Sequence, residues 1–414
     1  MINKIDVYYE GWGERWHWGT LAQAPHATIV FEYSDRALQE GLELSALHLP
    51  LSTVSYSEFE QFNEYLPGVI ADALPDGWGR LLMDRVLRQQ GIDPAQVSVL
   101  ERLTYISNTA MGAFSFLPQK NLVEADKSDI GLEHLAKEAQ LVLEGENSQI
   151  LIELFELGGS PQGARPKALV YRHPNTERIS TLAFAEAEHW LVKFPAKSEH
   201  PEVCAIEYLY HACAHQCGLE VPNVEHFNLG NGLAAFGTQR FDRQNTMRVP
   251  MQTLAGYLNA NFRIPNCDYD TFLRATDHIT NHSVIEVKKA FALMLFNIIF
   301  NNRDDHTKNF SYVLNQKREW QLAPVYDLTF NEGPNGYHQM SVMGETKSIS
   351  KKAVMDLART VNISPTETEK IIKHYAKVAS QFSALCNTHF PKEIRPTTAK
   401  YIQQVINQNL SKLI

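Results

Sequence analysis

Two acidic residues and one asparagine in the C-terminal half have the types and spacing that metal-assisted group transfer requires. Asp304 and Asn309 lie in the polar segment 301–310 (NNRDDHTKNF), directly after a strongly apolar stretch. A carboxylate can orient an attacking hydroxyl group and accept its proton. An amide oxygen suits Mg²⁺, a hard cation that prefers oxygen ligands. An Asp-x4-Asn match taken alone is common, because aspartate often caps a turn in a polar loop.

Asp327 strengthens this interpretation. It lies in the segment 322–329 (LAPVYDLT), after a predicted short hairpin over 310–313 and 320–322. Kinases place an aspartate in this setting, where it links the metal to the ATP phosphates. The local motif is Tyr-Asp-Leu rather than Asp-Phe-Gly, and an ordinary turn would explain the aspartate by itself. Its spacing from the Asp-x4-Asn pair favours a metal ligand.

Lys193 interrupts the apolar segment 190–195 (WLVKFP). An unpaired buried charge is costly, so Glu207, in a predicted helix over 201–218, is its natural partner. In kinases a strand lysine paired with a helix glutamate in this way contacts the α- and β-phosphates. The alternative is an edge-strand lysine whose ammonium group reaches water. We favour the paired arrangement.

A glycine-rich segment, 158–167 (GGSPQGARPK), precedes this strand. Glycines let backbone N–H groups approach anionic oxygens, so phosphate binding is expected, although the segment matches neither the Walker pattern nor the strict kinase pattern. Lys167 is a phosphate ligand or a surface charge. Further on, the segment 239–243 (QRFDR) either presents backbone groups of Gln239 and Phe241 to adenine or forms a charged linker whose aspartate pairs with the arginines.

The predicted elements have an order that suits these residues. Strands are expected at 6–10, 27–33, 42–51, 168–171, 189–194, 224–229 and 233–240. Helices are expected between 57 and 91, within a charged connector over 121–147, at 148–157 and 201–218, at 284–300 as a buried helix, and as three amphipathic helices from 350. A glycine-rich loop, strands and a helix before a helical half match the two-lobe kinase layout. We predict an α+β, two-lobed fold with parts 1–120, 121–243 and 244–414.

Composition limits the function classes. The 414 residues include 47 acidic and 38 basic side chains, a net charge of −9, so a whole-chain basic footprint for nucleic acid is absent, although a local patch is possible. The five cysteines are scattered. Cys213 and Cys217, with His215 between them, are interpreted as core residues rather than a metal site. Free thiols suit the cytoplasm, and no signal-like or membrane-spanning apolar run is found.

Taken together, the motifs resemble those of the HipA family of bacterial serine/threonine kinases, the toxin partners of toxin–antitoxin pairs. The resemblance covers nearly the whole chain. It comprises the segments 65–79 (YLPGVIADALPDGWG), 163–167 (GARPK), 193–195 (KFP), 240–243 (RFDR), 304–309 (DDHTKN) and 324–327 (PVYD), together with Glu207. Several motifs in the same order as in the family make the resemblance specific, whereas any one of these motifs alone would not.

The resemblance implies ATP and Mg²⁺ as cofactors and a role for each matching residue. Asp304 would be the catalytic base, and Asn309 and Asp327 would be the metal ligands. Residues that bind the nucleotide would be Gly163, Ala164, Arg165, Lys167, Lys193, Glu207, Gln239, Phe241, His306, Lys308, Asn309 and Asp327. The sequence departs from the family's pattern at two places. Gln239 replaces an acidic hinge residue that is common in the family, and Arg165-Pro166 stiffens the glycine-rich loop.

Ser160 occupies the place of a loop serine whose autophosphorylation ejects the glycine-rich loop in this family. Its added negative charges would compete with the ATP phosphates for the same amides and lysines. The plain alternative is an unmodified loop serine.

The resemblance also implies partners. Family substrates include aminoacyl-tRNA synthetases, notably the glutamyl enzyme, whose phosphorylation halts translation. The usual antitoxin is a HipB-like helix-turn-helix protein, and operator DNA is expected mainly through it. Two alternatives stay open. One is a small-molecule kinase of the aminoglycoside or choline type, against which the N-terminal unit argues. The other is a pseudokinase in a transcriptional repressor complex, against which the complete set of site residues argues.

Overall fold

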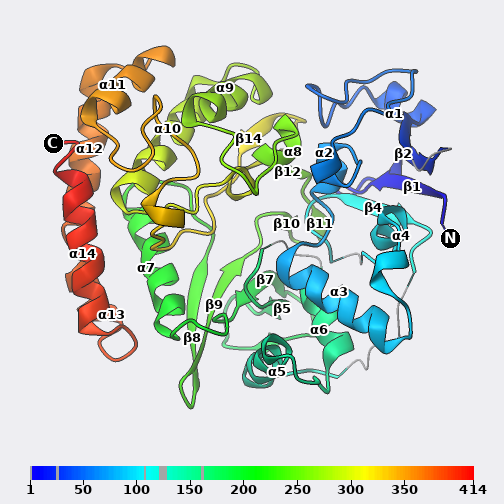
Figure 1. Ribbon diagram of the computed structural model, residues 1–414, viewed down its shortest axis with the longest axis horizontal. Helices are drawn as coiled ribbons and strands as arrows, with labels where there is room; N and C mark the ends of the chain where they lie inside the picture. The colour runs from blue at the N-terminus through cyan, green and yellow to red at the C-terminus, as the bar shows by residue number, and fades with distance from the viewer. Residues whose placement is uncertain (1, 25–27, 107–108, 121–127, 160–162) are drawn as a thin grey trace.

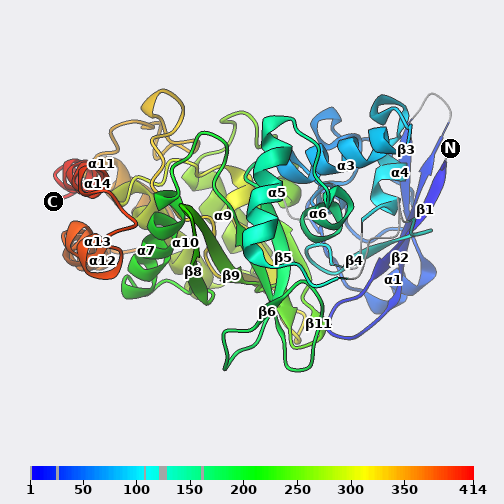
Figure 2. The ribbon, with the colours of Figure 1, turned by 90° about the horizontal axis from the view of Figure 1, so that it is seen from below.

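A computed structural model describes residues 2–24, 28–106, 109–120, 128–159 and 163–414. The N-terminal strands lie at one end of the long axis of the molecule and the C-terminal helices at the other (Figures 1 and 2). A five-stranded sheet lies between these ends.

An antiparallel sheet in the order β3-β2-β1-β4 forms the centre of the N-terminal subdomain. Its strands are β1 (Lys4–Tyr9), β2 (Trp16–Gln23), β3 (Ile29–Tyr33) and β4 (Phe114–Leu117). The helical elements are α1 (Asp35–Glu40), η2 (Gln61–Asn63), α2 (Gly68–Ala71), α3 (Gly77–Gln89), η3 (Pro94–Gln96) and α4 (Val99–Thr104). Alternate residues of β1 are buried, as expected for a sheet with one face on a core. Trp18 packs edge-on against Tyr33 in that core.

The predicted strand at 42–51 is wrong. Leu42, Leu44 and Leu49 are buried, but the segment has no strand geometry, so its apolar side chains fill the core without a sheet partner. The strand β2 was not predicted, because Gly19 and its polar neighbours weaken the local signal. Pairing with β1 and β3 determines its conformation.

The second sheet has the order β6-β5-β7-β9-β8 and carries the glycine-rich segment and Lys193. It is built from β5 (Lys167–Arg172), β6 (Ile179–Ser180), β7 (Glu188–Lys193), β8 (Val224–Gly230) and β9 (Leu233–Gln239), with the helices α5 (Leu132–Glu144), α6 (Leu151–Gly158) and α7 (Glu202–Gln216). The side chains of α5 and α6 share a core with one face of this sheet (Figure 2). Trp78 of α3 belongs to the same core, so the N-terminal subdomain packs directly on the nucleotide-binding region expected from the sequence.

The C-terminal half is mainly helical and encloses the largest hydrophobic core. Its short strands are β10 (Arg243–Gln244), β11 (Met247–Arg248), β12 (Met251–Thr253), β13 (Ser311–Leu314) and β14 (Trp320–Leu322). Its helices are α8 (Leu254–Leu258), α9 (Tyr269–Ile279), α10 (Val284–Ile299), η4 (Thr307–Asn309), η5 (Pro334–Gly336), α11 (Lys351–Thr360), α12 (Pro365–Ala379), α13 (Phe382–His389) and α14 (Pro396–Leu410). The buried helix and the short hairpin are confirmed. The expectation of three helices after 350 is wrong, since a turn at Ser380 separates α12 from α13 and makes four.

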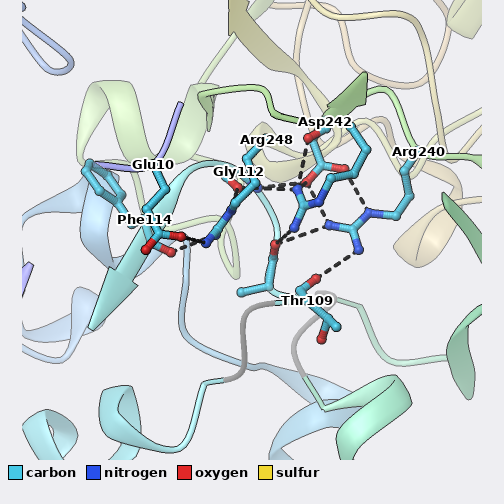
Figure 3. Close-up of polar contacts among 9 residues, drawn as sticks. Glu10, Thr109, Gly112, Phe114, Arg240, Asp242 and Arg248 are labelled. Atoms are coloured by element: carbon cyan, nitrogen blue, oxygen red, sulfur yellow. Dashed lines mark hydrogen bonds and ion pairs between the residues drawn. The ribbon is translucent and has the colours of Figure 1, made fainter. Parts of the chain in front are cut away.

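A buried ionic network joins the 239–243 segment to the N-terminal subdomain (Figure 3). Asp242 is fully buried and accepts two hydrogen bonds of 2.8 Å from Arg240, one of 2.7 Å from Arg243 and one of 2.8 Å from the backbone of Gly112. Both arginines also donate to backbone carbonyls of the 109–112 loop. Arg248 extends the network by donating to Gly112 O and Phe114 O and pairing with Glu10. The aspartate does pair with the arginines, as the linker alternative proposed, and the network also anchors another subdomain.

We expect the substitution Asp242→Asn to lower the free energy of unfolding by about 3–5 kcal/mol, because it leaves two buried arginines without their carboxylate. Burial disfavours ionisation, but the two guanidinium groups hold the pKa of Asp242 well below its usual range. The stabilisation is therefore present at neutral pH and shrinks as the pH falls below about 4.

Urea unfolding of both proteins at pH 7 and pH 3.5 measures this effect. Glu133→Gln removes the exposed pair with Lys137 and is the matched control, expected to change stability by less than about 0.5 kcal/mol. Equal stability of wild type and Asp242→Asn at pH 7 would contradict the role of the network.

Candidate active site

Lys193, Glu207 and Asp327 come from three separate elements and meet in one ion-pair cluster. Lys193, at the end of β7, donates to Glu207 Oε1 on α7 at 2.7 Å and also pairs with Asp327. Burial disfavours the ammonium group, but the two carboxylates raise the pKa of Lys193. Burial likewise disfavours the charged form of Asp327, while Lys193 holds its pKa below the usual range. Lys193 and Asp327 are therefore both charged at neutral pH.

The backbone at Asp327 turns sharply toward the cluster. Its φ of 57° lies in the left-handed region, which non-glycine residues seldom adopt and which is frequent at functional sites. The hydroxyl group of neighbouring Tyr326 donates to the backbone oxygen of Lys308 at 2.6 Å. This bond holds the 322–329 segment against the 304–309 loop. The Asp327 side chain keeps 39% of its surface exposed, so it remains accessible to a ligand.

The 304–309 loop follows α10 and is closed by its own residues. The Asn309 amide donates to the backbone oxygen of Asp304 at 2.6 Å, and His306 Nε2 lies 3.7 Å from Asp304 Oδ1. Partial burial and the nearby carboxylates of Asp327 and Asp305 raise the pKa of Asp304, against the effect of His306. A raised pKa makes a carboxylate a better proton acceptor.

Asp305 anchors this loop, and the sequence analysis missed it. Its buried carboxylate accepts hydrogen bonds of 2.7 Å from Tyr269 Oη, His338 Nδ1 and the backbone of Gln339. The loop is thereby tied to α9 and to the segment that follows Asp327. The Asp304-Asp305 doublet was the available signal, but only burial shows which carboxylate is structural.

Two buried lysines lie side by side beneath the glycine-rich segment. Lys167 and Lys193 are direct partners in the register of β5 and β7, and only 3% and 7% of their surfaces are exposed. Burial and the neighbouring charge of Lys193 lower the pKa of Lys167 to about 8. A Cβ atom at Gly163, whose φ is 106°, would lie 2.4 Å from Lys167 Nζ, so glycine leaves the room that the ammonium group occupies. Two adjacent cations under a glycine-containing loop suit a polyphosphate.

Arg165 makes ion pairs with carboxylates of this site. It donates to Glu207 Oε2 at 3.0 Å and to Glu199 Oε1 at 2.6 Å and 3.1 Å. Both oxygens of Glu207 are thus engaged, one by Lys193 and one by Arg165. Arg165 therefore positions the glutamate in this structure. Ala164 lies in the same loop, against Gly77.

The remaining predicted residues contact segments other than the Lys193 cluster itself. Gln239 ends β9 and pairs with Asn223 through side chain and backbone, at 2.7 Å and 2.8 Å. The ring of Phe241 lies 5.5 Å from that of Tyr326, beside the segment that carries Asp327. Lys308 extends to Asp76 of the N-terminal subdomain, at 3.0 Å. Ser160 lies outside the described residues.

The donor set fits ATP with Mg²⁺. Magnesium is usually held by one or two protein oxygens together with substrate phosphates rather than by a full protein cage. In the described ranges, no group of three or more His, Cys, Asp or Glu side chains is placed to hold a metal ion. Cys213 and Cys217 are buried core residues, as expected.

Among the helices of the described ranges, none has the length and hydrophobicity of a transmembrane span.

Comparisons with known proteins place both halves of the chain in one family. Residues 6–117 match the HipA N-terminal domain, and residues 159–382, more than half of the chain, match the HipA-like C-terminal domain. No curated protein sequence matches the chain.

A solved toxin structure shares the fold over nearly its full length. HipA from the toxin–antitoxin complex of Shewanella oneidensis MR-1 with HipB and operator DNA matches at a TM-score of 0.67 and 17% identity, over 99% of this chain and 96% of that chain. The Helicobacter pylori proinflammatory kinase CtkA matches at a TM-score of 0.36 and 16% identity, over 56% of this chain and 89% of that one. The full-length match confirms the predicted α+β, two-lobed fold.

The depressed pKa of Lys167 predicts pH-dependent binding of ATP. Above pH 8 the ammonium group loses its proton, and the affinity for ATP should fall by up to about tenfold per pH unit. Arg keeps its charge in this range, so the substitution Lys167→Arg should flatten the profile. Calorimetric titration between pH 7.5 and 9.5 measures both proteins, with exposed Lys137→Arg as the control. The same pH dependence in wild type and Lys167→Arg would show that another group controls binding.

Proposed function

The chain belongs to the HipA family, and from this premise we propose that it is an ATP-dependent serine/threonine protein kinase that acts as the toxin of a toxin–antitoxin pair. The supporting observation is the convergence of Lys193, Glu207 and Asp327 beside Asp304. Lys193 and Asp327 are the proposed phosphate and metal ligands, and Asp304 is the proposed base. All three therefore lie beside one region between the sheet and the helical half. We keep the division into parts 1–120, 121–243 and 244–414 as a proposal.

In the proposed reaction, the residues of the chain bind, orient and accept a proton. Lys193 and Lys167 hold the phosphates of ATP, and Glu207 keeps Lys193 in place. Asn309 and Asp327 are the residues that would hold Mg²⁺, which when bound neutralises charge on the phosphates. Asp304 orients the hydroxyl group of the substrate and takes its proton. Gln239 and Phe241 would contact adenine, and His306 and Lys308 would contact the phosphates.

The proposed substrate is a cellular protein, and an aminoacyl-tRNA synthetase such as the glutamyl enzyme is the leading class. Its phosphorylation would inhibit translation and growth. A HipB-like antitoxin would neutralise the kinase and contact operator DNA, as the partner in the Shewanella complex suggests. The net charge of −9 agrees with indirect contact to DNA. Autophosphorylation at Ser160 would give a second means of inhibition.

We expect the substitution Asp304→Asn to lower kcat by about 10²–10⁴-fold, because it removes the proton acceptor. The affinity for ATP should stay within a few-fold, since the lysines remain. Transfer of labelled phosphate from ATP to proteins of a lysate measures the rate, and growth after induced expression measures toxicity. Asp277→Asn, at an exposed pair with His282, is the control.

Unchanged phosphate transfer in Asp304→Asn would refute the assigned base. Label that appears in small molecules rather than in proteins would refute the proposed substrate class.

A further inference from the structure

The glycine-rich loop rests on a segment of the N-terminal subdomain, residues 76–79. The backbone N–H of Gly163 donates to a carboxylate oxygen of Asp76. The backbone N–H of Trp78 donates to Gly163 O at 3.1 Å, and its indole N–H donates to Lys167 O at 3.1 Å. The described end of the loop is therefore held at three points by a segment distant in sequence.

Glycine residues allow the backbone of the 76–79 segment to contact the backbone of the glycine-rich segment directly. A Cβ atom at Gly77 would lie 2.7 Å from Gly163 O, and one at Gly79 would lie 2.3 Å from Gly159 O. Within the glycine-rich segment itself, a Cβ atom at Gly158 would lie 2.2 Å from Lys167 O. Such distances are too short for any side chain, so the two backbones lie in close contact. The positions of Gly159 and Gly163, at the two described ends of the loop, therefore depend on the 76–79 segment.

The second carboxylate oxygen of Asp76 contacts the C-terminal, helical half of the chain. Lys308 Nζ, in the 304–309 loop, donates to it at 3.0 Å, and the side chains of Asp76 and Lys308 are only 16% and 13% exposed. Burial disfavours ionisation, but Lys308 and the N–H of Gly163 hold the pKa of Asp76 below its usual range. One ionised carboxylate from the N-terminal subdomain thus links the glycine-rich loop to the loop of the proposed base.

A neighbouring aspartate shows a different arrangement. Asp72, at the C-terminal end of α2, accepts hydrogen bonds from the backbone and hydroxyl group of Thr253, at 2.7 Å and 2.8 Å. It anchors the segment on α8. Asp76 instead contacts Gly163 and Lys308, two residues that the family resemblance assigns to nucleotide binding.

We propose that Asp76 is a positioning residue for phosphoryl transfer, an inference that rests on the proposed kinase function. Its carboxylate sets the separation between Gly163 and Lys308, so that the backbone at Gly163 and the remaining N–H groups of the Lys308 ammonium are in place for the terminal phosphate before ATP binds. Preorganised donors raise the rate of a group transfer, and a displacement of about 1 Å can lower the rate roughly 100-fold. The N-terminal subdomain is thereby a part of the catalytic site.

A double-mutant cycle tests this inference. Asp76→Asn keeps an oxygen for the Gly163 N–H but removes the ion pair with Lys308, and should lower kcat about 10–100-fold. If Asp76 acts through Lys308, the double variant Asp76→Asn with Lys308→Met should be no more than about twofold slower than Lys308→Met alone. Losses that multiply, or a kcat of Asp76→Asn within threefold of wild type, would overturn the proposal.

A binding measurement keeps this test separate from the kinase proposal. Calorimetry with ATP, ADP and adenosine should show that Asp76→Asn leaves adenosine affinity within twofold but reduces the preference for ATP over ADP at least fivefold. Tighter binding of ATP would instead show that Asp76 competes with phosphate, and an unchanged ATP-to-ADP preference would also overturn the proposal. If wild type transfers no phosphate, the kinase proposal fails, and this binding result still decides the role of Asp76.

Two further variants support the interpretation. Asp76 is the residue that precedes α3, where serine is a favoured helix cap, so Asp76→Ser replaces Asp76→Asn if the latter does not fold. It should show the same loss of ATP preference. Glu64→Gln removes an exposed pair with Arg80, near the same segment, and should leave kcat and all three affinities unchanged.

Discussion

The structure depends on keeping one ammonium group charged inside a largely apolar protein. Lys193 is 7% exposed, and without partners its charge would be too costly to bury. Glu207 and Asp327 make burial possible, but only if α7 and the 322–329 segment both approach the end of β7. This requirement fixes the relative placement of the sheet, the helix packed on it and the helical half. The geometry of the candidate site follows from it.

The surrounding elements maintain that placement with further buried charges. Arg165 engages the second oxygen of Glu207, and Asp305 ties the loop of Asp304 to α9 and to the chain beyond Asp327. In each case one partner has several hydrogen bonds, which is the condition under which a buried ion is tolerated. Asp242 serves the same purpose at the junction with the N-terminal subdomain. Movement of any one element would remove at least one partner from a buried charge.

The N-terminal subdomain has more than one connection to the rest of the molecule. Its 109–112 loop is bound to the segment after β9 (Figure 3). Its 76–79 segment is hydrogen-bonded to Gly163 and Lys167 of the glycine-rich segment. Because the second contact reaches Gly163 and Lys308, the subdomain contributes to the region where phosphate binding is proposed.

The sequence by itself determined the residue types of the site, the order of the elements around them and the paired state of Lys193, because charge burial and hydrophobic periodicity are local signals. Most strands and helices of the second sheet and the buried α10 were predictable for the same reason. Only the tertiary structure decided that β2 is a strand and 42–51 is not, since sheet pairing joins residues distant along the chain. It likewise separated Asp304 from Asp305 and brought Asp76 to Gly163 and Lys308, because burial and long-range contact are properties of the folded chain.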